Sequence, residues 1–192
     1  MRIGIDIDDT IADTWNYMIP IYSKVFKKDI KTLSNSYPYH MSIKDLNISV
    51  EEYFNIMKPY YKKNILNVPL KPYAKYTINK LYDEGHTIIF ITARGKIYDD
   101  PYKITKEYLS KNEIKYHKLI TEATDKSIVC TKESIDLFID DSFKHCNAVK
   151  STGIKVLMPN TIYNKQYTEF PHFSSWKEVP TYIKNINIET GE

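Results

Sequence analysis

The chain opens with the stretch RIGIDIDDT, residues Arg2–Thr10, in which a short apolar run ends at Asp6 and is followed by Asp8 and Asp9. Such a run predicts a buried strand. Two unit charges about 4 Å apart repel by roughly 4 kcal/mol at an effective dielectric constant near 20, so carboxylates crowded at one strand end are costly. A divalent cation is the usual way to offset that cost. The stretch therefore predicts a strand whose carboxyl end holds a metal ion.

Later segments alternate between two patterns. Four more short apolar runs read as buried parallel strands: Thr87–Thr92, Lys118–Thr121, Ile135–Asp140 and Ile154–Met158. Between them, apolar residues recur at helical spacing in Pro72–Glu84, Pro101–Asn112 and Phe143–Thr152, and Gly85 and Gly153 stand at helix stop positions. Strands alternating with helices predict an α/β fold with a doubly wound parallel sheet.

Residues 13–70 do not fit this alternation and read as an insertion. Their apolar positions are helical in Thr14–Phe26 and again in Val50–Tyr61, where Ser49 and Glu52 resemble a capping box. We therefore expect a small helical cap inserted after the first strand. The expected division is an α/β core of residues 1–12 and 71–184, a cap of residues 13–70, and a polar, frayed tail of residues 185–192.

Polar side chains follow several of the predicted strands, at the sheet edge where doubly wound folds bind their ligands. The residues placed there are Asp6, Asp8, Thr92, Asp140 and Asp141, with Lys126 in the connection before the last of these strands. Carboxylates, one hydroxyl and one ammonium at one edge make a site for a metal ion and a phosphoryl group.

Each of these residue types has a chemical use. Asp6 can attack phosphorus and form an acyl phosphate, and Asp8 can protonate the leaving oxygen and then deprotonate water. Phosphoryl transfer also needs positioning and neutralisation of the equatorial oxygens, which Thr92 and Lys126 would supply. The candidate residues for binding phosphate or substrate are Thr92, Ala93, Arg94 and Lys126.

An all-oxygen site with few protein ligands suits Mg²⁺. The expected ligands are Asp6, the backbone carbonyl of Asp8, Asp140, and Asp141 either directly or through water.

Four motifs in this order, DIDDT, Thr92 in TARG, Lys126 and the pair Asp140–Asp141, resemble those of the haloacid dehalogenase-like superfamily. The resemblance covers most of the chain. It implies a Rossmann-like core, magnesium dependence and an aspartyl-phosphate mechanism, with Asp6 as nucleophile and Asp8 as acid and base. The helical insertion and the sequence TDKSIVCTKESIDLFIDDS resemble the cytosolic 5'(3')-deoxyribonucleotidase type and its bacterial relatives. That narrower resemblance implies a 5'-nucleotidase acting on nucleoside or deoxynucleoside monophosphates.

Two other functions remain open at this point. The same core chemistry would serve a phosphatase of a sugar phosphate or another small metabolite. A phosphoacceptor signalling domain also combines acidic residues, a Thr and a Lys around magnesium, although its motif order differs.

Several residues have competing roles. Asp9 is favoured as a turn or helix-entry residue, and Thr10 either stiffens the loop or acts directly. Lys132 competes with Lys126, and Arg94 is either a surface charge or a bidentate contact to phosphate or base. The aromatic residues of the first cap segment fit a core better than a base-stacking platform, with Trp15 as the best exception.

Composition narrows the remaining possibilities. The 192 residues are 42% hydrophobic and carry a formal charge of +3 without a basic block, which favours a globular domain and disfavours nucleic-acid polymers as partners. Five glycines cannot supply the common nucleotide-binding loops, and Cys130 and Cys146 have no metal spacing, like His86, His117 and His145. No long apolar segment or signal peptide is evident, so we expect no membrane partner, a cytoplasmic location, and a monomer or homodimer.

Overall fold

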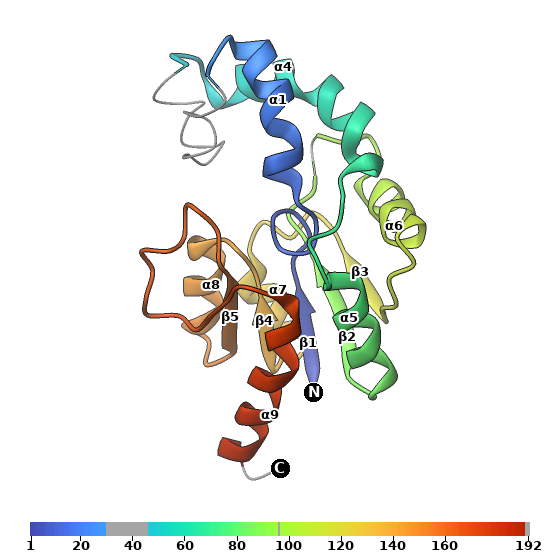
Figure 1. Cartoon of the computed structure of the whole chain (residues 1–192), viewed down its shortest axis with the longest axis vertical. Helices are drawn as coiled ribbons and strands as arrows, with labels where there is room; N and C mark the ends of the chain where they lie inside the picture. The colour runs from blue at the N-terminus through green and yellow to red at the C-terminus, as the bar shows by residue number, and fades with distance from the viewer. Residues whose placement is uncertain (30–45, 96, 191–192) are drawn as a thin grey trace.

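The structure is a computed structural model that describes residues 1–29, 46–95 and 97–190. Its centre is a parallel sheet in the order β3-β2-β1-β4-β5-β6, which confirms the predicted α/β fold (Figure 1). The strands are β1 (Arg2–Ile5), β2 (Thr87–Ile91), β3 (Lys118–Ile120), β4 (Leu137–Ile139), β5 (Lys155–Pro159) and β6 (His172–Phe173). The first strand therefore lies in the middle of the sheet, and the order reverses beside it.

Helices cover both faces of the sheet. One face packs against α5 (Ala74–Asp83), α6 (Pro101–Lys111) and α9 (Val179–Thr190), which follows the short 3₁₀ turn η2 (Trp176–Glu178). The other face packs against α7 (Lys126–Lys132) and α8 (Phe143–Lys150).

Alternation along β1 explains how the strand serves both faces. Ile3 and Ile5 are fully buried in the core between the sheet and helices α5, α6 and α9, called the first core here. Gly4 faces the opposite core, under α7 and α8, where a Cβ would lie 3.1 Å from side-chain atoms of Ile91 and Phe138. A larger residue at this position would force the side chains of Ile91 and Phe138 to shift.

Two helices stand beyond the carboxyl ends of the strands, at the top of Figure 1: α1 (Thr14–Phe26) and α4 (Val50–Asn64), which is followed by the 3₁₀ turn η1 (Ile65–Asn67). They share an apolar cluster of their own that includes Trp15, Tyr22 and Tyr53, so the predicted aromatic core is confirmed. The predicted capping box is also present, with Ser49 and Glu52 bonded reciprocally. Residues 30–45 of the predicted cap lie outside the described residues.

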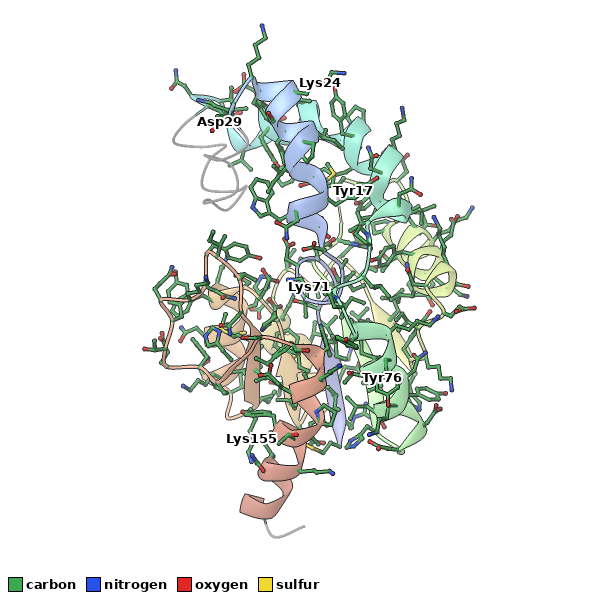
Figure 2. All side chains as sticks on the ribbon, in the orientation of Figure 1. Tyr17, Lys24, Asp29, Lys71, Tyr76 and Lys155 are labelled. Atoms are coloured by element: carbon green, nitrogen blue, oxygen red, sulfur yellow. The ribbon has the colours of Figure 1, made fainter. Side chains whose placement is uncertain are left out.

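Some side chains of the helices point outward, away from the sheet and from the cluster between α1 and α4. Lys24 on α1 and Tyr76 on α5 are exposed and can be located in Figure 2. Tyr76, which lies within the segment Pro72–Glu84 that was predicted to be helical, is 65% exposed.

Several features differ from the sequence-based expectations. Strand β6 and helix α7 were not predicted, and β4 is shorter than the apolar run from Ile135 to Asp140. Helix α9, which was also not predicted, continues to Thr190, and Ile186 is buried in the first core, although residues 185–192 were expected to form a polar, frayed tail. Residues 191–192 of the tail lie outside the described residues.

Candidate active site

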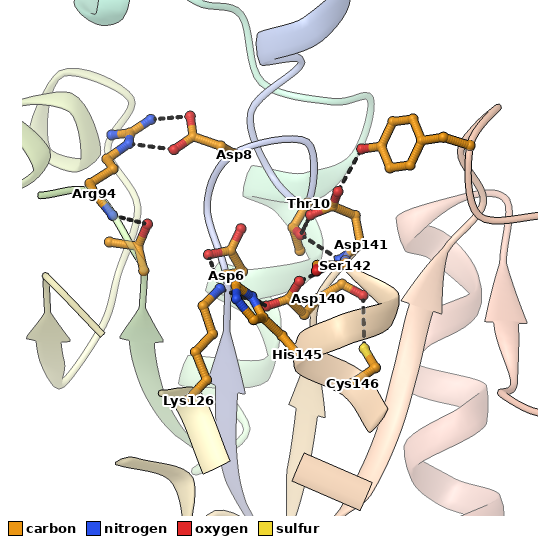
Figure 3. Close-up of polar contacts among 12 residues, drawn as sticks. Asp6, Asp8, Thr10, Arg94, Lys126, Asp140, Asp141, Ser142, His145 and Cys146 are labelled. Carbon is orange, nitrogen blue, oxygen red and sulfur yellow. Dashed lines mark hydrogen bonds and ion pairs between the residues drawn. The ribbon is translucent and has the colours of Figure 1, made fainter. Parts of the chain in front are cut away.

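The residues predicted to act in catalysis meet where β1, β2 and β4 end, as Figure 3 shows. Asp6 follows β1, and its backbone N–H donates to the carbonyl of Ile139 at 2.9 Å, which extends the contact with β4. Arg94 comes from the segment after β2, and Asp140 and Asp141 follow β4. The strand ends therefore bring together residues more than 130 positions apart in the chain.

Lys126 lies between two of the carboxylates. Its Nζ donates to Asp6 Oδ1 at 2.5 Å and to Asp140 Oδ2 at 2.6 Å, and all three side chains are buried. Lys126 is held there because it is the first residue of α7, which Asp125 caps by accepting from the backbone N–H groups of Ser127 and Ile128. The competing Lys132 is exposed at the other end of that helix.

Asp141 is fixed by hydroxyl groups. Thr10 Oγ1 donates to Asp141 Oδ1 at 3.2 Å and accepts from the Asp141 backbone N–H at 3.1 Å. Thr10 thus ties the loop after β1 to the end of β4, which agrees with the loop-stiffening role considered for it. A second hydroxyl, that of Tyr163, donates to Asp141 Oδ2 at 2.5 Å.

Asp8 faces a different partner from the other carboxylates. Arg94 holds it with two parallel hydrogen bonds of 2.7 Å, from Nε to Oδ2 and from Nη2 to Oδ1. Thr14 Oγ1, at the start of α1, donates to the same carboxylate at 2.7 Å. Arg94 is therefore not a surface charge, and its bidentate contact is made to a carboxylate of the protein, whereas the contact considered for it was to phosphate or base.

Charge and burial shift the pKa values of Asp6 and Asp8, the aspartates two residues apart in the DxD pattern, in opposite directions. Burial raises the pKa of Asp6 to about 6; the Lys126 ammonium opposes this shift, and the carboxylates of Asp140 and Asp8 add to it. Burial also favours the neutral form of Asp8, yet the Arg94 guanidinium outweighs it and lowers the pKa of Asp8 below its usual value. In this arrangement Asp8 is an ionised carboxylate with a fixed orientation.

The pKa values of Asp140 and Asp141, the two residues that follow β4, are also shifted in opposite directions. Burial is opposed at Asp140 by Lys126 and His145, which lower its pKa. Burial raises the pKa of Asp141 well above its usual value, and the neighbouring carboxylates of Asp140, Asp9 and Asp6 reinforce the effect.

Three carboxylates form a group that fits a metal ion. Oxygen atoms of Asp6, Asp140 and Asp141 all lie within 4.8 Å of one another, and all three residues are buried. A set of three carboxylate oxygens suits a hard divalent cation. The Asp8 carboxylate is engaged with Arg94 and Thr14, so only its backbone carbonyl remains a predicted ligand.

Thr92 and Ala93 lie at the end of β2 beside Arg94. Thr92 is buried, and its Oγ1 accepts from the Arg94 backbone N–H at 3.4 Å. Both residues line the same cavity as Asp6, so the structure places them where a bound phosphate could be contacted.

A cavity of about 1090 Å³ lies between the sheet edge and the two helices above it. Its floor includes Asp6, Asp8 and Lys126, and its roof includes residues of α1 and α4: Thr14, Trp15, Tyr22, Val50, Glu51, Phe54, Asn55, Lys58 and Tyr61. Trp15 both packs in the aromatic cluster and lines the cavity, and stacking of a base on its ring stays a prediction.

Asp9 supports the entry into α1. It adopts φ of 56°, a conformation that Asp tolerates in turns, and its Oδ1 accepts from the Trp15 backbone N–H at 2.8 Å. This placement agrees with the helix-entry role predicted for it. Cys130 and Cys146, which have no metal spacing in the sequence, are both free and buried.

Sequence reasoning missed two residues at this site. His145, interpreted as structural or at the surface, lines the cavity with Nδ1 3.4 Å from Asp140 Oδ2. Its position in the first turn of the helix that begins just after the Asp140–Asp141 pair was the available signal. Tyr163 carried no such signal, because it lies in the long connection between β5 and β6, far from any motif.

Comparison with known proteins agrees with this geometry. A family described as "5' nucleotidase, deoxy (Pyrimidine), cytosolic type C protein" matches residues 1–188. The chain belongs to this family. It is also 32% identical to a nucleotidase of Clostridium acetobutylicum over 93% of this chain and 91% of that protein.

Solved structures show the same fold. A haloacid dehalogenase-like family hydrolase from Streptococcus pneumoniae matches with a TM-score of 0.70 and 18% identity over 95% of this chain and 97% of that chain. A HAD phosphatase from Thermococcus onnurineus matches with a TM-score of 0.59 and 15% identity over 95% and 97%. The predicted haloacid dehalogenase-like fold is confirmed, and the chain is a member of a 5'-nucleotidase family.

None of the helices that the structure describes combines the length and apolar composition needed to cross a membrane. The cytoplasmic location, the oligomeric state and the absence of a nucleic-acid partner stay predictions.

Proposed function

We propose that this protein is a magnesium-dependent phosphomonoester hydrolase that works through an aspartyl phosphate on Asp6, and that its substrates are nucleoside or deoxynucleoside 5'-monophosphates. The observation that carries the proposal is the placement of Asp6 and Lys126 in direct contact at the floor of a large cavity, beside Asp140 and Asp141. The nucleophile, a cation and a metal-binding group are thereby adjacent.

In the first step, an Asp6 carboxylate oxygen forms a bond to phosphorus while the bond from phosphorus to the leaving oxygen breaks, and that oxygen takes up a proton. In the second step, a water oxygen attacks phosphorus, gives up a proton, and releases Asp6 and inorganic phosphate. The contact with Lys126 places a positive charge next to the oxygens that become more negative.

Asp8 is proposed to carry both protons. Its ionised, bidentate pairing with Arg94 suits the second step directly, because a carboxylate can accept the proton of the attacking water. Protonating the leaving oxygen requires Asp8 to bind a proton and loosen its contact with Arg94. Arg94 therefore influences which step limits the rate.

Mg²⁺ is proposed to bind to Asp6, Asp140 and Asp141, together with the backbone carbonyl of Asp8. When bound, it would neutralise phosphate charge and orient the phosphoryl group.

The nucleotide substrate is supported by the family description, by the name of the Clostridium relative, and by the cavity. We propose that residues 13–70 act as a cap over residues 1–12 and 71–184. The apolar side chains of Trp15 and Phe54 and the polar side chains of Asn55 and Lys58 line its cavity side. Such a mixture suits an aromatic base joined to a hydroxylated sugar.

A panel of monophosphates tests this proposal. We expect kcat/KM to be highest for nucleoside 5'-monophosphates, activity to disappear with a chelator and return with Mg²⁺, and Asp6→Asn to be inactive on every substrate. A strong preference for sugar phosphates would overturn the nucleotide assignment while leaving the chemistry intact. Full activity of Asp6→Asn would overturn the mechanism.

A further inference from the structure

The connection between β5 and β6 reaches back over the end of β4 and holds Asp141 at two points. The Tyr163 hydroxyl donates to Asp141 Oδ2 at 2.5 Å. The side-chain amide of Asn164 donates to the backbone carbonyl of Asp141 at 3.0 Å and to that of Pro159 at 2.9 Å. Two adjacent residues thus contact the side chain and the main chain of one carboxylate residue.

Asn164 is itself rigidly placed. It is 1% exposed, and its Oδ1 accepts from the Thr161 backbone N–H at 2.9 Å. Since its amide group donates to two carbonyls and its Oδ1 accepts, each part of this side chain has a partner. The segment that carries Tyr163 is therefore pinned to the end of β4.

The ring of Tyr163 is held from the other side. It packs against the aromatic cluster shared by α1 and α4, so its hydroxyl is anchored between that cluster and Asp141. A hydroxyl on a packed ring has little freedom to follow a moving carboxylate.

Asp141 needs such restraint because of its surroundings. It lies in a buried group with Asp6 and Asp140, and like charges drive its carboxylate away from the others. Thr10 donates to Oδ1 and Tyr163 donates to Oδ2, so each oxygen keeps lone pairs that remain available to a cation (Asp141 and Thr10 in Figure 3). Hydrogen bonds of this kind typically fix the orientation of a carboxylate ligand.

We propose that Tyr163 is the positioning residue that holds Asp141 in the orientation in which it contributes to divalent cation binding. This inference rests on the proposed function, because the cation is part of that proposal. It adds a role for a residue outside the four motifs.

The test compares Tyr163→Phe, which removes only the hydroxyl, with Tyr167→Phe. Tyr167 lies in the same connection and stacks on Phe143 with ring centroids 3.9 Å apart, and its hydroxyl has no hydrogen bond among the described residues. Mn²⁺ binding to the full chain is measured by electron paramagnetic resonance, and the Mg²⁺ concentration for half-maximal activity is measured in parallel. Thermal unfolding in the presence of a chelator shows that both variants are folded.

We expect Tyr163→Phe to weaken Mn²⁺ binding and to raise the half-maximal Mg²⁺ concentration by about 10-fold, the lower end of the usual effect of removing a partner of a metal ligand. Substrate KM at saturating Mg²⁺ should not change, and Tyr167→Phe should match the wild type. Adding Tyr163→Phe to Asp141→Asn should cause no further loss of Mn²⁺ affinity, since both changes act through one carboxylate.

Unchanged Mn²⁺ affinity in folded Tyr163→Phe would overturn the inference, and so would an additive loss in the double variant. A wild-type protein that binds no Mn²⁺ and hydrolyses phosphomonoesters without a divalent cation would instead overturn the proposed magnesium dependence. The two failures are therefore distinguishable.

Discussion

The two sides of the site differ in their balance of charge. On one side, the carboxylates of Asp6, Asp140 and Asp141 are grouped together, and the ammonium of Lys126 contacts only Asp6 and Asp140. On the other, Asp8 and Arg94 form a matched bidentate pair. The first side is short of positive charge and suits an added cation. On the second side the charges of Asp8 and Arg94 balance, and the pairing fixes the orientation of the Asp8 carboxylate. This difference gives the two aspartates of the DxD pattern different chemistry although they are two residues apart.

The largest effect is expected from removing the buried ammonium on the crowded side. Lys126→Met leaves Asp6 and Asp140 without their shared partner, and breaking a buried ion pair in this way typically costs about 3–5 kcal/mol. Urea unfolding with a chelator should show this loss, and phosphatase activity should fall below detection. Lys132→Met, in the same helix but exposed, is the control and should resemble the wild type. Equal stability of the two variants would show that Lys126 does not neutralise the cluster.

Disrupting the Asp8–Arg94 pair should lower the catalytic rate without changing the affinity for the metal ion. Asp8→Asn keeps the backbone carbonyl but removes the group that carries protons, so kcat should fall by about 10²–10⁴-fold. Mn²⁺ affinity should stay at the wild-type value. A large loss of Mn²⁺ affinity would mean that the Asp8 carboxylate itself binds the ion.

A milder change on the same side is Arg94→Lys, which keeps the charge but cannot make two parallel hydrogen bonds. Loss of one charge-assisted bond worth about 1.5 kcal/mol corresponds to about a 10-fold lower kcat. KM should be unchanged if Arg94 acts through Asp8. A raised KM with unchanged kcat would restore the earlier prediction that Arg94 binds substrate.

The smallest effect concerns Asp9, which accepts from the Trp15 backbone N–H at the entry into α1. Burial raises the pKa of Asp9 to about 7, so its contribution to stability is present at low pH and is lost as pH rises through 7. Asp9→Asn keeps an acceptor for the Trp15 N–H and removes this loss. With a chelator present, the melting temperature of the variant relative to the wild type should therefore be higher at pH 8 than at pH 5.5. A difference that does not change with pH would contradict the buried, titrating carboxylate.

The sequence contained enough to predict the sheet and most of the site, because strand ends and motif order are local patterns. Asp6, Lys126 and the Asp140–Asp141 pair lie where the motifs place them. The partner of Arg94 could not be predicted, since a guanidinium beside a phosphate site serves a ligand or a protein carboxylate equally well.

Other features were missed because their signals are weak. Helix α7 has only seven residues, too few to show helical periodicity, although Asp125 gave the usual sign of a helix start. Ile186 lies in a polar-looking tail, and its burial depends on long-range packing against the first core.

The central claim is that Asp6 becomes phosphorylated during turnover, and trapping that species tests it most directly. Protein mixed with a nucleoside monophosphate and Mg²⁺ is quenched with borohydride, which reduces an acyl phosphate to the alcohol, and the digested peptides are analysed by mass spectrometry. The account predicts homoserine at position 6 in the wild type and none without substrate or in Asp6→Asn. Turnover with no reduced residue at position 6, or with reduction at Asp8 instead, would contradict it.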